Sequence, residues 1–288
     1  MAEKKITIGL IQSVAFGDRP RNLQNTMTKI AQAAEKGAQI ICLQELFLTF
    51  YFPQDEKKYV SHLSEFIPGK TTKKLSSLAK QLKVVIIVPL YEKDIKGNYY
   101  NSAAVIDAGG KIAGVYRKNH IPFDPLFYEK NYFSEGDSGY PVFHTQYADI
   151  SVLICYDQWF PEAARACVLQ GAEIIFYPTA IGWIKDYNAK GEDWHEAWET
   201  VQRGHAIANG AYVASVNRVG QEGGIQFWGG SFLCDSFGKI LEKASKEKEE
   251  ILIAKIDLTM NRRIQEDWGF LKNRRPESYQ MLCKKKLS

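Results

Sequence analysis

Three side chains with reactive groups stand directly after apolar stretches of the chain. Glu45, Lys118 and Cys155 follow the segments 40–44, 112–117 and 150–154, each of which is typical of a buried strand. Folds that alternate strands and helices place their functional side chains just past the carboxyl ends of strands. Cys155 also precedes a helix predicted from Pro161, and a helix N-terminus lowers the pKa of a nearby thiol. Together the three residues supply the nucleophile, the base and the positive charge that cysteine catalysis requires.

Each of these residues also fits a purely structural role when it is taken alone. A cysteine after an apolar strand is commonly a small core residue, and a lone Lys or Glu at a strand end is commonly solvated. It is their combination that favours chemistry. Residues 136–139 (Gly-Asp-Ser-Gly) echo a serine-protease motif but lack the matching His and Asp contexts. The glycine-rich segment 220–231 lacks the ending of a phosphate loop, and we expect an active-site loop there.

Three ordered motifs identify a resemblance that extends over nearly the whole chain. Residues 43–47 (LQELF), 116–122 (YRKNHIP) and 154–162 (ICYDQWFPE) resemble the nitrilase superfamily of carbon–nitrogen hydrolases. The resemblance implies an α/β fold, a four-layer α-β-β-α sandwich of the nitrilase type. It also implies a catalytic triad of Glu45, Lys118 and Cys155, and a second catalytic glutamate at Glu129.

Within the superfamily, the sequence around Cys155 and the closing segment 268–279 are most similar to the N-carbamoylputrescine amidohydrolase branch. The activity implied is cleavage of N-carbamoylputrescine to putrescine, ammonia and carbon dioxide through a thiol acyl-enzyme. Glu45 is expected to act as base, while Lys118 and the backbone N–H of Tyr156 stabilise the oxyanion. The triad requires no metal or other cofactor, and the five histidines form no HxxxH or HxH pair.

The residues that bind the substrate's distal end are a separate question. Segment 183–199 holds five acids and two bases, and this net charge of −3 favours a cationic substrate tail, although solvation of a helix explains such a run equally well. His120, two residues past Lys118, is a further candidate. Four aromatic residues are candidates for the pocket walls, with core packing as the alternative for each: Tyr51, Phe52, Trp159 and Trp183.

Other activities use the same machinery. An N-carbamoyl-β-amino acid amidohydrolase, an ω-amidase or another aliphatic amidase or nitrilase would keep the triad. A catalytically silent binding protein that retains the fold is a rival from a different class, and the intact triad argues against it. An N-carbamoyl amino acid would need a cationic clamp for its carboxylate, whereas carbamoylputrescine needs an anionic or aromatic partner for its ammonium group.

Alternating strands and helices must hold the candidate site residues in place. Four helices are expected, at about 23–34, 75–82, 161–170 and 193–209, with glycines 37, 171 and 210 at three of their ends. Strands are expected at 6–11, 38–43, 84–88, 99–106, 112–117, 150–154, 174–177, 211–216, 231–234, 240–242 and 251–256. No Pro- or Ser-rich linker interrupts this alternation. We therefore expect one domain over residues 1–288, in which the aromatic and basic segment 268–288 is a docking tail.

Composition excludes several classes of protein. The chain has 288 residues and a formal net charge of +4, too small an excess for a dedicated nucleic-acid binder. Five cysteines without CxxC spacing argue against a disulfide framework and fit a reducing compartment. No stretch approaches the ~20 apolar residues of a membrane span, so we expect a cytoplasmic protein without membrane partners. Its expected partners are a small carbamoyl or amide substrate and, from the resemblance, further copies of itself in a homodimer or larger assembly.

Overall fold

Two six-stranded sheets form the centre of the molecule. The computed structural model describes residues 4–184, 187 and 191–284. The first sheet has the order β15-β1-β2-β3-β4-β5, with β1 and β2 parallel and the hairpin strands β3, β4 and β5 antiparallel. Its strands are β1 (Lys5–Gln12), β2 (Ile40–Leu43), β3 (Val85–Lys93), β4 (Tyr99–Ile106), β5 (Ile112–Arg117) and β15 (Glu250–Asp257).

The second sheet has the order β14-β13-β10-β8-β7-β6 and a parallel centre. Its strands are β6 (Phe143–His144), β7 (Asp149–Val152), β8 (Ile174–Pro178), β10 (Tyr212–Val216), β13 (Phe232–Cys234) and β14 (Ile240–Lys243). A smaller antiparallel sheet, β11-β12-β9, consists of β9 (Gly182–Ile184), β11 (Val219–Glu222) and β12 (Ile225–Trp228).

The alternation of side chains along the strands produces the layers. In β2, Ile40 and Cys42 pack in a core shared with the second sheet, whereas Ile41 and Leu43 pack against the helices on the other face. Because both faces of this strand are covered, all four of its residues are apolar and buried.

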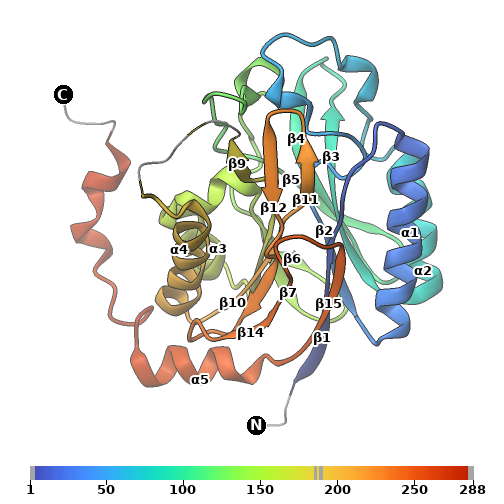
Figure 1. The fold of residues 1–288 in the computed structure, drawn as a ribbon. Helices are drawn as coiled ribbons and strands as arrows, with labels where there is room; N and C mark the ends of the chain where they lie inside the picture. Colours follow the sequence, from blue (N-terminus) through green and yellow to red (C-terminus); the bar gives the residue numbers. More distant parts are fainter. Residues whose placement is uncertain (1–3, 185–186, 188–190, 285–288) are drawn as a thin grey trace.

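Helices cover the outer face of each sheet (Figure 1). Helix α1 (Arg19–Glu35), capped by the Asp18 side chain, and α2 (Lys70–Leu82) pack on the first sheet. Helices α3 (Pro161–Leu169) and α4 (Trp194–Asn209) pack on the second sheet, and Pro161 stands at the N-terminus of α3, where proline is favourable. The four-layer α-β-β-α sandwich implied by the sequence motifs is therefore confirmed.

Three local predictions were wrong. The strand expected at 150–154 ends at Val152, and a 3₁₀ turn, η4 (Cys155–Trp159), begins at the nucleophile candidate. The glycine-rich segment expected to be a loop forms the β11–β12 hairpin, because Gly223 at its turn adopts a positive φ of 54°. Helix α5 (Thr259–Trp268) was not predicted, since only two of its residues are buried and its apolar stripe is thin. No helix in the described part of the chain is long and apolar enough to cross a bilayer.

Candidate active site

The first sheet carries the predicted base, Glu45, and the ammonium group of Lys118, and the second sheet carries the thiol of Cys155. Glu45 lies in the turn after β2, and Lys118 directly follows β5. Cys155 begins η4, three residues past the end of the second-sheet strand β7. Glu129 begins a short 3₁₀ turn, η3 (Glu129–Asn131), in the loop beyond Lys118. The site is therefore assembled where strand ends of the two facing sheets meet.

Lys118 is at the centre of a buried ionic cluster. Its Nζ lies 3.0 Å from Glu45 Oε1 and 2.7 Å from Glu129 Oε2, and all three side chains are fully buried. Burial lowers the pKa of Lys118, but the Glu129 and Glu45 carboxylates raise it by more, so the net shift is upward. Lys118 therefore stays charged and holds both carboxylates in place.

Glu45 has one oxygen engaged and one free. Oε1 accepts hydrogen bonds from Lys118 Nζ and, at 2.7 Å, from Asn101 Nδ2. Oε2 is buried without a hydrogen-bond partner among the described residues. A buried carboxylate oxygen without a partner is costly, and at an active site it is available to take a proton from a substrate or a nucleophile.

Glu129 is fully engaged. Its carboxylate accepts two hydrogen bonds from Lys118 Nζ, at 2.9 and 2.7 Å, and one from the Tyr51 hydroxyl at 2.6 Å. Burial raises the pKa of Glu129, Lys118 opposes this, Glu45 adds to it, and the result is a pKa of about 7. This glutamate therefore shares its proton equilibrium with the rest of the cluster.

Cys155 has a strained backbone and a protonated thiol. Its φ of 46° lies in the left-handed region that L-residues rarely adopt, a feature that concentrates at functional sites. Asp157 holds the turn, since its Oδ2 accepts hydrogen bonds from the Ile154 N–H at 2.9 Å and the Tyr116 hydroxyl at 2.7 Å. Burial, followed by the Glu45 charge, raises the pKa of the Cys155 thiol well above its ordinary value. The expected lowering by a helix dipole is thus outweighed, and the thiol requires a base.

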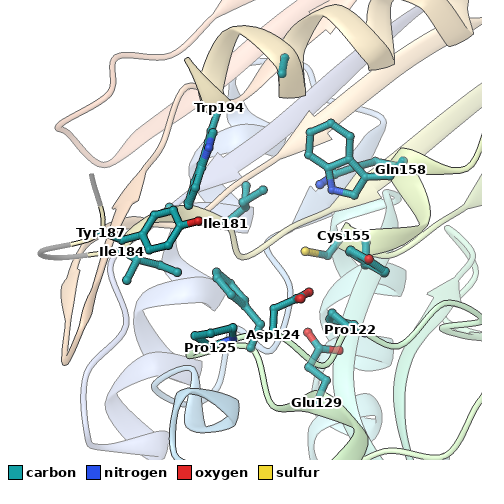
Figure 2. Close-up of a pocket in the computed structure, with 15 residues that line it drawn as sticks. Pro122, Asp124, Pro125, Glu129, Cys155, Gln158, Ile181, Ile184, Tyr187 and Trp194 are labelled. Atoms are coloured by element: carbon teal, nitrogen blue, oxygen red, sulfur yellow. The ribbon is translucent and has the colours of Figure 1, made fainter. Parts of the chain in front are cut away.

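A cavity of about 420 Å³ opens onto Cys155 and Glu129 (Figure 2). Most of its walls are apolar or aromatic, and Asp124 and Glu129 are the charged groups that line it. Its lining consists of Pro122, Asp124, Pro125, Phe127, Glu129, Cys155, Tyr156, Gln158, Trp159, Ile181, Gly182, Ile184, Tyr187, Trp194 and Ala197.

The structure separates the predicted substrate-binding residues into two groups. Trp159 lines the cavity, as does Tyr156, which was predicted only for its backbone N–H. Tyr51 is fully buried behind Glu129, and Phe52 packs in an aromatic cluster, so neither is part of the lining. Trp183 and His120 are also outside the lining. Trp183 stacks on Trp194, with ring centroids 5.9 Å apart, and His120 Nδ1 lies 2.7 Å from Asp157 Oδ1.

Three residues of the site were not singled out from the sequence. Asn101 holds Glu45, and its signal was a polar side chain inside an otherwise buried strand. Asp124 lies in the cavity wall, and its signal was its place between Lys118 and Glu129 in the chain. Arg218 donates to the backbone oxygens of Glu45 and Leu46, at 2.8 and 3.1 Å. A single arginine after an apolar strand carries no signal of this role.

Part of the predicted acidic segment lies outside the described residues, namely Lys185, Asp186 and Lys190. Three of the four described acids of the segment have partners of their own, and none of the four lines the cavity. Glu192 accepts from the Trp194 indole N–H, Asp193 caps α4, and Glu199 pairs with Lys243.

The comparisons with known proteins agree with this geometry. The carbon–nitrogen hydrolase family model matches residues 7–266. An N-carbamoylputrescine amidase of Solanum lycopersicum is 41% identical, with 98% of this chain and 97% of that protein covered. A citrullinase of Francisella tularensis is 38% identical over 97% of this chain and 99% of its own length.

A solved structure resembles the whole chain. The carbon–nitrogen hydrolase of Helicobacter pylori G27 superposes with a TM-score of 0.94 at 42% identity, covering 98% of this chain and 100% of that one. A buried Glu–Lys–Glu cluster next to a thiol, on a four-layer sandwich, is thus accompanied by full-length sequence similarity. The chain belongs to the carbon–nitrogen hydrolase family and is an amidohydrolase that acts on non-peptide carbon–nitrogen bonds.

Proposed function

We propose that this protein hydrolyses N-carbamoylputrescine to putrescine, ammonia and carbon dioxide. The observation that carries the proposal is the lining of the cavity, whose described residues combine apolar walls with the carboxylates of Asp124 and Glu129 and include no Lys, Arg or His. An aliphatic chain with a cationic end suits such a cavity, whereas a substrate with a distal carboxylate would lack a partner there. The similarity to the tomato N-carbamoylputrescine amidase supports the same choice.

In the proposed mechanism, Glu45 takes the proton of the Cys155 thiol as the sulfur attacks the carbamoyl carbon. Lys118 and the backbone N–H of Tyr156 stabilise the negative charge that develops on the carbonyl oxygen. The carbon–nitrogen bond then breaks, and Glu45 returns its proton to the departing nitrogen. Glu45 then takes a proton from water, which attacks the S-thiocarbamate, and the proton passes to the departing Cys155 sulfur. The carbamic acid that results loses carbon dioxide to release the second amine.

Citrulline is the second candidate substrate, because a citrullinase is among the similar proteins and citrulline has the same ureido group. Its α-carboxylate distinguishes it from carbamoylputrescine. The experiment is a panel of N-carbamoylputrescine, citrulline, N-carbamoyl-β-alanine and an ω-amide, with ammonia release as the readout. We expect the highest kcat/KM for N-carbamoylputrescine. Equal or higher values for a carboxylate-bearing substrate would overturn the assignment and leave the mechanism standing.

The mechanism has its own control in Cys155→Ala. This variant keeps the fold and removes the nucleophile, so we expect no ammonia release from any substrate of the panel. Activity at the wild-type level would contradict the thiol mechanism. Ligand binding without turnover in the wild-type protein would instead indicate a binding protein.

We further propose that the protein acts in a reducing cytoplasm and forms a homodimer or larger homo-oligomer. All five cysteines are free, and four of them are buried. The docking tail, residues 268–288, exposes Trp268, Met281 and Leu282 on its described part. Such exposed apolar side chains favour an interface with another chain, and we assign it to a second copy.

A further inference from the structure

One charged group of the cavity has no role in the mechanism. Asp124 lies in the short loop between Lys118 and Glu129, flanked by Pro125 and close to Pro122. A backbone bridge closes this loop, since the Phe127 N–H donates to the Asp124 carbonyl oxygen at 2.8 Å. The prolines and this hydrogen bond restrict the backbone. In Figure 2 the side chain of Asp124 points into the cavity, on the side that holds Cys155 and Glu129.

The Asp124 carboxylate is also free to bind a ligand. None of the hydrogen bonds or ion pairs between described residues involves its side chain. Glu129, the other carboxylate of the lining, is saturated by Lys118 and Tyr51. Among the described residues of the lining, Asp124 is therefore the negative charge that remains for a substrate cation.

The neighbours of Asp124 suit an alkylammonium chain. Trp159, Ile181 and Ile184 provide apolar surface, and Tyr187 and Trp194 place their rings 5.4 Å apart in the same wall. Aromatic faces attract cations and accept methylene groups. Tyr156 lies within the field of Asp124, since the pKa of its hydroxyl is raised by burial and then by this carboxylate. Asp124 and the residue that follows Cys155 thus line the same cavity.

We propose that Asp124 binds the distal ammonium group of the substrate and determines the preference for cationic ureas. The inference rests on the proposed function and adds the residue that binds the positive charge of the substrate. It assigns this role to the loop before Glu129 and not to the acidic segment 183–199, because none of the described acids of that segment lines the cavity.

The test compares two substrates that differ in the presence of a terminal ammonium group. N-butylurea has the ureido group and the four-carbon chain of N-carbamoylputrescine but lacks the ammonium group. We expect D124N to reduce the ratio of kcat/KM for N-carbamoylputrescine to that for N-butylurea about tenfold, the scale of one charged hydrogen bond at a partly exposed site. The matched control is E196Q, which removes an acid of the acidic segment outside the cavity and leaves the ratio unchanged.

A charge reversal provides a second measurement. In D124K we expect the preference to shift toward N-carbamoyl-4-aminobutyrate, whose distal carboxylate replaces the ammonium group. An unchanged ratio in D124N, or an equal loss on both substrates, would overturn the role of Asp124. Retention of the wild-type substrate order in D124K would do the same.

The two proposals fail in different ways. If the wild-type protein prefers another cationic substrate, such as 5-aminopentanamide over pentanamide, the N-carbamoylputrescine assignment is wrong. The D124N ratio is then measured on that pair of amides and still decides the role of Asp124. If the wild-type protein prefers anionic substrates, both proposals are overturned.

Discussion

At the scale of single residues, Cys155 is a buried thiol beside a cluster of two carboxylates and one ammonium group. Burial and the Glu45 charge both raise the pKa of Cys155, so the free protein holds a neutral thiol. Glu45 has its Oε2 unengaged, and it is the group that we assign as the acceptor of this proton. The site therefore differs from cysteine sites in which a cation beside the sulfur maintains a thiolate.

The first prediction concerns this base. Glu45→Gln preserves the shape and the hydrogen-bond acceptor of the side chain but cannot take a proton. We expect kcat to fall roughly 10²- to 10⁴-fold, with little change in KM. Steady-state kinetics on N-carbamoylputrescine measure this, with Glu196→Gln as the control of equal charge change. A change in KM with an unchanged kcat would contradict the assignment of Glu45 as the base.

The second prediction concerns pH. Because the pKa of Glu129 is raised to about 7, this carboxyl takes up a proton below that pH and weakens its ion pair with Lys118. We expect kcat/KM of the wild-type protein to decrease as the pH falls below about 7. In Glu129→Gln we expect this decrease near pH 7 to be absent. The folded state binds this proton more tightly than the unfolded chain, so protonation of Glu129 favours folding. Loss of activity near pH 6 is thus not expected to come with unfolding, which circular dichroism checks.

At the scale of elements, the sequence predicted the strands and helices with long, regular apolar patterns. The strand ends that hold Glu45 and Lys118 agree with the prediction within one or two residues. The contacts of Asn101, Asp124 and Arg218 were not predictable, because they join segments that are distant in sequence and meet only after the sheets have formed and packed. A local pattern contains no information about such pairings.

The β11–β12 hairpin is an element whose role depends on its packing. Arg218, at the start of this hairpin, pairs with Glu222 at 2.7 Å and donates to the carbonyl oxygen of Glu45. Glu222 in turn accepts from the Tyr51 N–H at 2.6 Å. The hairpin thus supports the turn in which Leu46 adopts a φ of 50°.

This support leads to the third prediction. Arg218→Met leaves the buried Glu222 charge unpaired, so we expect a loss of about 3 kcal/mol in the free energy of unfolding. We also expect a lower kcat in the remaining folded protein, because the turn of Glu45 loses two donors. Arg262→Met is the control, since Arg262 forms an exposed pair with Glu266 at the same spacing. A lower melting temperature with unchanged kcat per folded molecule would contradict the positioning role.

At the scale of the whole molecule, the described part of the C-terminal tail, residues 268–284, leaves the sandwich (Figure 1) and has exposed apolar side chains. A second cavity of about 590 Å³ lies between this tail and the helices α3 and α4. The fourth prediction is that the double variant Met281→Asp/Leu282→Asp lowers the mass in solution, measured by light scattering after gel filtration. Ile95→Asp is the control, because Ile95 is 92% exposed and lies in the β3–β4 turn. An unchanged mass would exclude the tail as the interface.

The division of the site between the two sheets has a mechanical consequence. Glu45 and Lys118 move with one layer and Cys155 with the other, so their alignment depends on how the layers are registered across the shared core. A slip of about 1 Å between reacting groups can cost roughly 100-fold in rate. Catalytic activity therefore reports on small displacements of one sheet relative to the other. On heating or under pressure, we expect the activity to fall before the hydrogen bonds within either sheet are lost.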